Sequence, residues 1–158
     1  MSIKFVLPAD IEEVFELMTD PEYLVERNMA MGDIESECEV KETDIALLVR
    51  LKREKKLDLP GVFADVLGGS QVFNIEEQWQ VEDDRYVGIS TATVGGQSGT
   101  VHTEFTLSPA KKGCEYEVKH SAKIKIPMIG RKVEKFIVKT AAGDARKELE
   151  YIRTVLTS

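Results

Sequence analysis

Residues 127–156 read PMIGRKVEKFIVKTAAGDARKELEYIRTVL, and this stretch decides the fold of the chain. Its apolar side chains recur every three or four residues, which is typical of one face of a long amphipathic helix. The positions on that face are Ile129, Val133, Phe136, Ile137, Thr140, Ala141, Ala145, Leu149, Ile152, Val155 and Leu156. Two acids, Asp144 and Glu148, fall within or beside this apolar arc. Polar groups on the inner face of a helix that closes a sheet predict a cavity for a small molecule.

The composition indicates one globular domain over residues 1–158. The chain is 42% hydrophobic and 31% charged, which suits one hydrophobic core with a soluble surface. Its net charge of -7 argues against nucleic acid as a partner and against broad attraction to anionic membranes, because both attract cationic proteins. We expect a monomer or a homodimer.

Several features point to a cytoplasmic protein without a metal or another cofactor. The N-terminus has no apolar run suited to a signal peptide, and no segment has the roughly 20 apolar residues of a membrane span. Cys38 and Cys114 form no metal-binding motif, so we expect buried thiols, with a disulfide as the alternative. The two histidines, His102 and His120, have no spaced partners that would indicate a zinc site.

Strand-like segments fill the part of the chain before the long helix. Residues 2–7 predict a strand, and two short helices follow, over residues 10–19 and 22–28. Alternating apolar and polar residues predict further strands over 34–40, 45–53, 71–81, 85–93, 99–108 and 114–126. This alternation places Ile34, Ile45 and Val81 on inner faces, whereas the inner face of residues 85–93 stays open.

The order of these segments predicts an α+β, helix-grip fold. A curved antiparallel sheet of six to seven strands would wrap round the long C-terminal helix, with the two short helices after the first strand. Residues 58–69 interrupt the strands and predict a short helix over an opening, either a mobile lid or a static plug. The basic run at residues 52–56 is typical of a solvated turn.

Both ends of the chain resemble one known superfamily. The opening IKFVLPADIEEVFELMTDPEYL (residues 3–24) and the closing IPMIGRKVEKFIVKTAAGDARKELEYI (residues 126–152) are similar to those of START-like proteins. This superfamily is also called SRPBCC or Bet v 1-like and includes polyketide-cyclase-like domains. The segments LPGVFADVLGG (59–69) and EEQW (76–79) look like a domain-of-unknown-function branch of it. The resemblance implies one START-like ligand-binding domain, but the superfamily's functions range from carriers to enzymes and co-chaperones.

His120 is the strongest candidate for a ligand-binding or catalytic residue. Strand alternation points His120 inward, beside the long helix, where an imidazole could orient a ligand carbonyl or transfer a proton. The alternative is a core histidine satisfied by a neighbouring hydroxyl or carboxylate.

Three acids are expected near the same cavity. Asp144 and Glu148 lie one helical turn apart, and Glu77 points inward between Ile75 and Trp79. If two of them approached each other or His120, one carboxyl could hold a raised pKa and act as an acid. The alternative is that they pair with Arg50 or Arg131 or lie at the mouth of the cavity.

Apolar and aromatic side chains complete the predicted ligand site. The candidate ligand-binding residues are Phe63, Val66, Glu77, Trp79, Tyr116, His120, Phe136, Thr140 and Asp144. Large aromatic side chains on inner faces also serve as ordinary core.

Three function hypotheses follow from these residues. The first is binding or transport of a hydrophobic or amphipathic small molecule, lipid-like or polyketide-like. The second is a cyclase or dehydratase that uses His120 with an inner carboxylate. The third, a co-chaperone-like interaction module, would use the outer sheet face, which is mostly charged. We favour the first hypothesis and expect a binder rather than an enzyme.

Overall fold

The computed structural model describes residues 2–56, 61, 70–94, 99–126 and 128–158. Its elements are β1 (Ser2–Leu7), α1 (Ile11–Met18), α2 (Pro21–Ala30), β2 (Glu35–Glu42), β3 (Leu47–Lys56), β4 (Ser70–Glu82), β5 (Arg85–Val94), β6 (Gly99–Ala110), β7 (Gly113–Ile124) and α4 (Gly130–Leu156). The predicted helix over residues 58–69, with Phe63 and Val66, lies outside the described residues except for Gly61.

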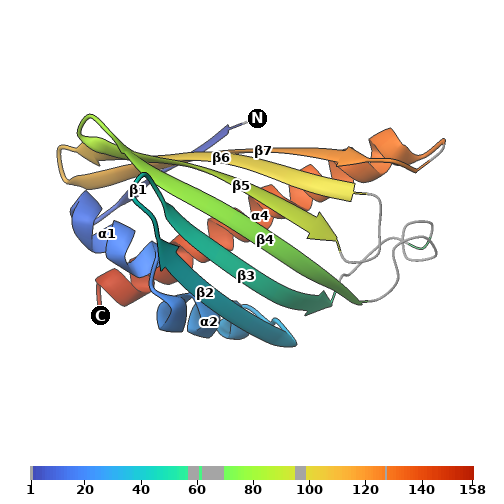
Figure 1. Cartoon of the computed structure of the whole chain (residues 1–158), viewed down its shortest axis with the longest axis horizontal. Coiled ribbons are helices and arrows are strands. Elements are labelled where there is room, and N and C mark those ends of the chain that lie inside the picture. The colour runs from blue at the N-terminus through green and yellow to red at the C-terminus, as the bar shows by residue number, and fades with distance from the viewer. Residues whose placement is uncertain (1, 57–60, 62–69, 95–98, 127) are drawn as a thin grey trace.

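All described strands form one antiparallel sheet of seven strands in the order β1-β7-β6-β5-β4-β3-β2. Strands β2 to β7 follow one another as a meander, and β1 pairs with β7. The long helix α4 runs across one face of the curved sheet, while α1 and α2 lie between β1 and β2 in the chain (Figure 1). This arrangement confirms the predicted helix-grip fold.

Aspartate side chains begin the two short helices. Asp10 accepts a hydrogen bond from the backbone N–H of Glu13 at 2.9 Å, and Asp20 accepts one from that of Glu22 at 3.1 Å. Each bond satisfies a backbone donor that the first helical turn leaves without a partner. Pro21 occupies the first turn of α2, where its missing N–H costs nothing.

The hydrophobic core lies between α4 and the sheet and continues under α1 and α2. Its fully or almost fully buried members include Leu7, Val14, Leu24, Val49, Leu107, Val118, Leu149 and Ile152. Both cysteines are free thiols, as predicted; Cys114 is fully buried in this core, whereas Cys38 is only half-buried and not buried as predicted.

The inner face of β5, which the sequence left open, is now decided. Ser90 and Ala92 line the inner side of the sheet, and the ring of Tyr86 stacks on Phe15 of α1 at 3.9 Å between centroids. Position 88, on the same face, leaves no room for a side chain, so glycine is required there. A Cβ built there would lie 2.1 Å from Cε2 of Phe105 on β6, so the aromatic ring occupies the place of a side chain.

Several predicted inner residues are exposed, and the prediction was wrong for them. Ile34, Ile45 and Val81 expose 47%, 77% and 71% of their surface. Ile34 and Ile45 precede their strands and Val81 is the penultimate residue of β4, so the helices do not cover them. The long helix also begins later than expected, at Gly130, because Met128 has a left-handed φ of 71° that a right-handed helix excludes.

Candidate functional site

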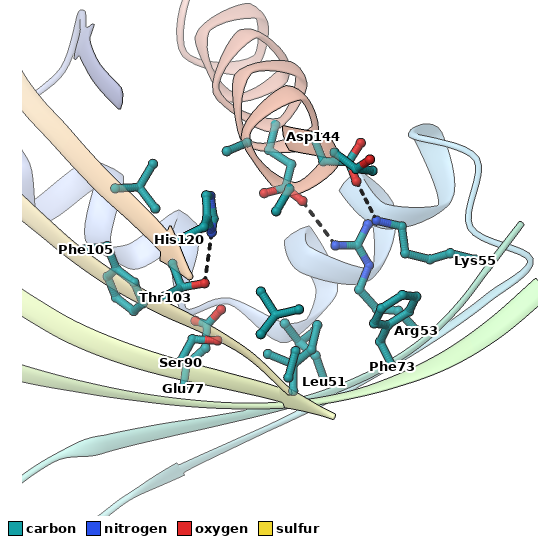
Figure 2. Close-up of a pocket in the computed structure, with 18 of the residues that line it drawn as sticks. Leu51, Arg53, Lys55, Phe73, Glu77, Ser90, Thr103, Phe105, His120 and Asp144 are labelled. Atoms are coloured by element: carbon teal, nitrogen blue, oxygen red, sulfur yellow. Dashed lines mark hydrogen bonds and ion pairs between the residues drawn. The ribbon is translucent and has the colours of Figure 1, made fainter. Parts of the chain in front are cut away.

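A cavity of about 220 Å³ lies between the sheet and α4. Most of its described lining comes from strands β3 to β7, α2 and α4, with Met18 from α1 and Ile126 after β7. Figure 2 shows side chains from the sheet and from α4 pointing into the same space. Seven of the predicted ligand-binding residues line it: Glu77, Trp79, Tyr116, His120, Phe136, Thr140 and Asp144. Their part in binding a ligand stays a prediction.

Strand register places four polar residues in one row across the sheet. Glu77 of β4 pairs with Ser90 of β5, Ser90 pairs with Thr103 of β6, and Thr103 pairs with His120 of β7. All four line the cavity. Directly opposed side chains on one face of an antiparallel sheet are neighbours, so this row forms a continuous polar band. We call these four residues the polar row.

Apolar rows lie on both sides of the polar row. On one side Ile75, Ala92 and Val101 pair across β4, β5 and β6. On the other side the row is Trp79, Gly88, Phe105 and Val118. Residues two apart along a strand are separated by about 6.7 Å. A ligand lying along the strands would therefore meet an apolar wall, a polar band and a second apolar wall.

Aromatic rings form much of the second wall. The centroid of the Trp79 ring lies 4.5 Å from that of Phe105 and 5.4 Å from that of Phe15. The contact with Phe15 is edge-to-face. Tyr116 lies 6.3 Å from Phe105. These separations are typical of stabilising aromatic pairs. The rings hold one another in fixed positions at this end of the cavity.

His120 occupies the β7 end of the polar row. Its Nδ1 lies 3.0 Å from Oγ1 of Thr103, a hydrogen bond marked in Figure 2. Its Nε2 is buried and has no hydrogen-bond partner among the described residues. Burial lowers the pKa of His120, against the opposing effect of the Glu148 and Asp144 carboxylates, so the imidazole is favoured in its neutral form.

Glu77 occupies the β4 end of the polar row. The indole N–H of Trp79 donates a hydrogen bond to Oε1 of Glu77 at 3.1 Å. Burial raises the pKa of Glu77, although this hydrogen bond and the charge of Arg27 act in the opposite direction. Glu77 lies on β4 and His120 on β7, with β5 and β6 between them. At ordinary strand spacing the backbones of β4 and β7 lie about 14 Å apart. Direct contact between the two groups is not part of this arrangement.

A buried ion pair lies beyond the Ile75 row, where β3 faces α4. Arg53 donates to Asp33 twice, from Nε to Oδ2 at 2.7 Å and from Nη2 to Oδ1 at 3.1 Å. Their side chains are only 6% and 2% exposed. Arg53 also donates from Nη1 to Oε1 of Glu148 at 3.1 Å, which ties β3 to α4. The bidentate geometry is the strong form of an arginine–carboxylate contact.

Two further cations surround the same acids. Nη2 of Arg27 lies 3.8 Å from Oε1 of Glu148, and Nζ of Lys55 donates to Oδ2 of Asp144 at 2.9 Å. Burial alone would raise the pKa of Glu148, but the charges of Arg27, Arg53 and Lys55 outweigh it and lower the pKa. Glu148 is thus held as a carboxylate.

Two expectations about this charged cluster were wrong. The inner acids do not pair with Arg50 or Arg131. Instead, Nε of Arg50 lies 3.7 Å from Oε1 of Glu76 on the outer face. The basic run at residues 52–56 is not a solvated turn but the last part of β3. Continued alternation from Val49 and Leu51 carries Arg53 and Lys55 inward, and this signal could have identified both residues.

The described residues provide no group of three His, Cys, Asp or Glu side chains that could hold a metal ion. Within the same ranges, no helix is both long enough and apolar enough to cross a membrane.

The fold and its cavity define a START-like, Bet v 1-like protein, and comparison with solved structures supports this class. A START superfamily protein from Mycobacterium smegmatis matches with a TM-score of 0.64 and 14% identity, over 98% of this chain and 97% of that one. Protein CV1439 from Chromobacterium violaceum matches with 0.57 and 17%, over 98% and 94%. Ara h 8.0201, which is Bet v 1-like, matches with 0.56 and 12%, over 98% and 97%.

The chain belongs to the family described as "Protein of unknown function (DUF2505)", whose sequence model matches residues 2–156. No curated protein matches it significantly. The START-like fold and the unknown-function family are therefore confirmed, and the site itself must carry any statement about function.

Proposed function

We propose that this protein binds or carries a small hydrophobic or amphipathic molecule, lipid-like or polyketide-like, in the cavity between the sheet and α4. The observation that carries this proposal is a 220 Å³ cavity with largely apolar walls and one polar band. Protein interiors are close-packed, with few voids larger than a water molecule. Ligand sites typically combine apolar walls with a few placed polar groups. The START-like fold supports the same reading.

This role would belong to one START-like domain spanning residues 1–158, acting in the cytoplasm as a monomer or homodimer. The seven predicted residues that line the cavity would contact the ligand. Ser90 and Thr103 would act with them, although sequence alternation alone did not single out either as a binding residue. Burying the ligand's apolar surface would supply about 25 cal/mol for each Å² removed from water.

A cavity-filling variant and a matched surface variant test the proposal. Ala92 lines the cavity on β5, whereas Thr93, the next residue, is exposed on the outer face. We expect the neutral fluorescent probe 1-aminoanthracene to bind the native protein saturably. Ala92→Phe should weaken this binding at least tenfold, and Thr93→Phe should leave it unchanged. Absence of saturable binding to the native protein, or equal binding by the two variants, would refute the proposal.

Mass spectrometry of the purified protein provides a second test. After denaturation and solvent extraction, we expect a stoichiometric small molecule from the native protein and from Thr93→Phe. Ala92→Phe should yield none. The same compound at the same amount in all three samples would mean that it is not bound in this cavity.

One observation favours a second candidate function, an enzyme of the cyclase or dehydratase kind. His120 presents a neutral imidazole to the cavity wall, and its Nε2 has no partner among the described residues. Such a group can accept or donate a proton at a substrate atom within about 3 Å. Against a joint mechanism with Glu77 stands their separation by two strands. An enzyme would lose turnover in His120→Gln while retaining ligand affinity; a pure binder would show no turnover in either form.

A further inference from the structure

The charged groups of the cavity neutralise one another. Arg53 is bonded to Asp33 and Glu148, and Lys55 is bonded to Asp144. Arg27 lies beside Glu148 at 3.8 Å. Three cations and three carboxylates thus form one cluster with no net charge, and each described cation of the lining already has an acidic partner. An incoming anion therefore finds no free cation among the described residues of the lining.

The polar groups that remain carry no charge or disfavour an anion. Ser90 and Thr103 are hydroxyls, and the pKa of His120 is lowered by burial, which favours the neutral imidazole. Burial raises the pKa of Tyr116, with a further rise from the Glu77 charge, so its phenol stays protonated. Of the acids in the described lining, Glu77 alone lies outside the charged cluster. Protonated, it is a neutral hydrogen-bond donor; ionised, it repels an anion.

Strand register places the polar row in the middle of the cavity floor. The polar row has Ile75, Ala92 and Val101 on one side and Trp79, Phe105 and Val118 on the other. Each apolar row begins about 6.7 Å from the polar row along the strands. A ligand whose hydrogen-bonding atom met the polar row would have apolar surface to bury in both directions.

We propose that the preferred ligand of this cavity is an uncharged molecule with a hydrogen-bonding oxygen near its middle, such as a ketone or alcohol, between two apolar arms. This inference rests on the proposed function, because it names the chemical class of the molecule bound in the same cavity. The hydroxyl of Ser90 and the carboxyl of Glu77 are the groups that meet the oxygen.

Anionic ligands are disfavoured for a physical reason. A carboxylate that enters the cavity loses its hydration, and this loss is repaid only by a paired cation or several hydrogen bonds. Lys55 is the cation most open to exchange, since its side chain is 22% exposed, but its bond to Asp144 at 2.9 Å would have to break first. A headgroup bound there would leave Asp144 unpaired.

Three probes with eleven carbon atoms test the inference at pH 7: undecan-6-one, undecan-6-amine and undecanoate. The first is neutral, the second is a cation and the third is an anion. Each is titrated against the protein loaded with 1-aminoanthracene, and displacement gives its affinity. We expect undecan-6-one to bind at least tenfold more tightly than either charged probe.

Two variants on β4 locate the effect. Glu77→Leu removes a polar group from the cavity, and Glu76→Leu makes the same change at the neighbouring exposed position. Glu77→Leu should weaken undecan-6-one binding at least fivefold, whereas Glu76→Leu should leave it unchanged. Circular dichroism establishes that both variants are folded.

The outcomes separate the inference from the proposed function. If undecanoate or undecan-6-amine binds as tightly as the ketone, or if Glu77→Leu matches Glu76→Leu, the inferred ligand class is wrong while the binding function stands. The same holds if 1-aminoanthracene binds saturably but none of the three probes displaces it. If 1-aminoanthracene itself shows no saturable binding, the proposed function and the inference both fail.

Discussion

The buried pair of Arg53 and Asp33 makes the most decisive prediction about this fold. Asp33→Asn keeps the size of the side chain but removes its charge and replaces one acceptor oxygen by a donor. Asp33 and Arg53 are 2% and 6% exposed and share two hydrogen bonds. The variant therefore leaves a buried guanidinium without its principal partner.

The structure sets the size of the expected loss. Removing one partner of a buried ion pair costs about 3–5 kcal/mol. Arg53 keeps its bond to Glu148 at 3.1 Å, so the charge stays partly compensated and we take the lower end. Asp33→Asn should lose about 3 kcal/mol of unfolding free energy. For a domain of this size, that loss lowers the melting temperature by roughly 6–12 °C.

Urea denaturation provides the assay, with Trp79 as reporter, since it is the only tryptophan of the chain and is almost fully buried. Asp144→Asn is the matched control. Its bond to Lys55 is 2.9 Å long, between the two Arg53–Asp33 bonds in length, but the side chains of Asp144 and Lys55 are 27% and 22% exposed. We expect a loss below about 1 kcal/mol there, because solvent screens exposed pairs. Equal losses in the two variants would refute the reasoning that burial decides the effect.

Two further predictions concern packing and pH. Gly88→Ala should lower the free energy of unfolding by about 1–3 kcal/mol, because the new Cβ would lie 2.1 Å from the Phe105 ring. Gly143→Ala, inside α4, should raise it by about 0.5–1 kcal/mol, because the new Cβ would meet no neighbouring atom within 4 Å. Thermal melts of both measure this, and an undiminished melting temperature in Gly88→Ala would contradict the close approach of the Phe105 ring to position 88. Burial raises the pKa of Glu77 above its unfolded value of 4.5. Glu77 therefore contributes fully to the stability of the fold below that pH, and this contribution is lost as the pH rises through the folded pKa. Glu77→Gln should therefore gain stability relative to the native protein as the pH rises above 4.5. Urea denaturation at a series of pH values measures this gain, and a difference that does not change with pH would count against a raised pKa.

The edges of the predicted elements show where local sequence patterns lose their force. Alternation in β2, β3 and β4 was read correctly in the strand interiors, yet Ile45 and Val81 are largely exposed. A period of two predicts that a residue shares a face with the residues two positions before and after it, but it does not predict how far the covering helix extends. The same pattern, followed further along β3, would have placed Arg53 in the interior. The basic residues next to Arg53 favoured a solvated turn instead.

The sequence by itself determined the order of the elements, the faces of most strands and the long helix with its inner acids, Asp144 and Glu148. These depend on periodicity and capping, which are local along the chain. Only the tertiary structure decided which groups meet. The polar row from Glu77 to His120 joins four strands through their register, and the partner of Glu148 is Arg53, 95 residues away. Register depends on the turns between strands and on burial of one sheet face, and the approach of a helix to a sheet depends on packing of the whole chain, so the periodicity of a single segment does not specify either.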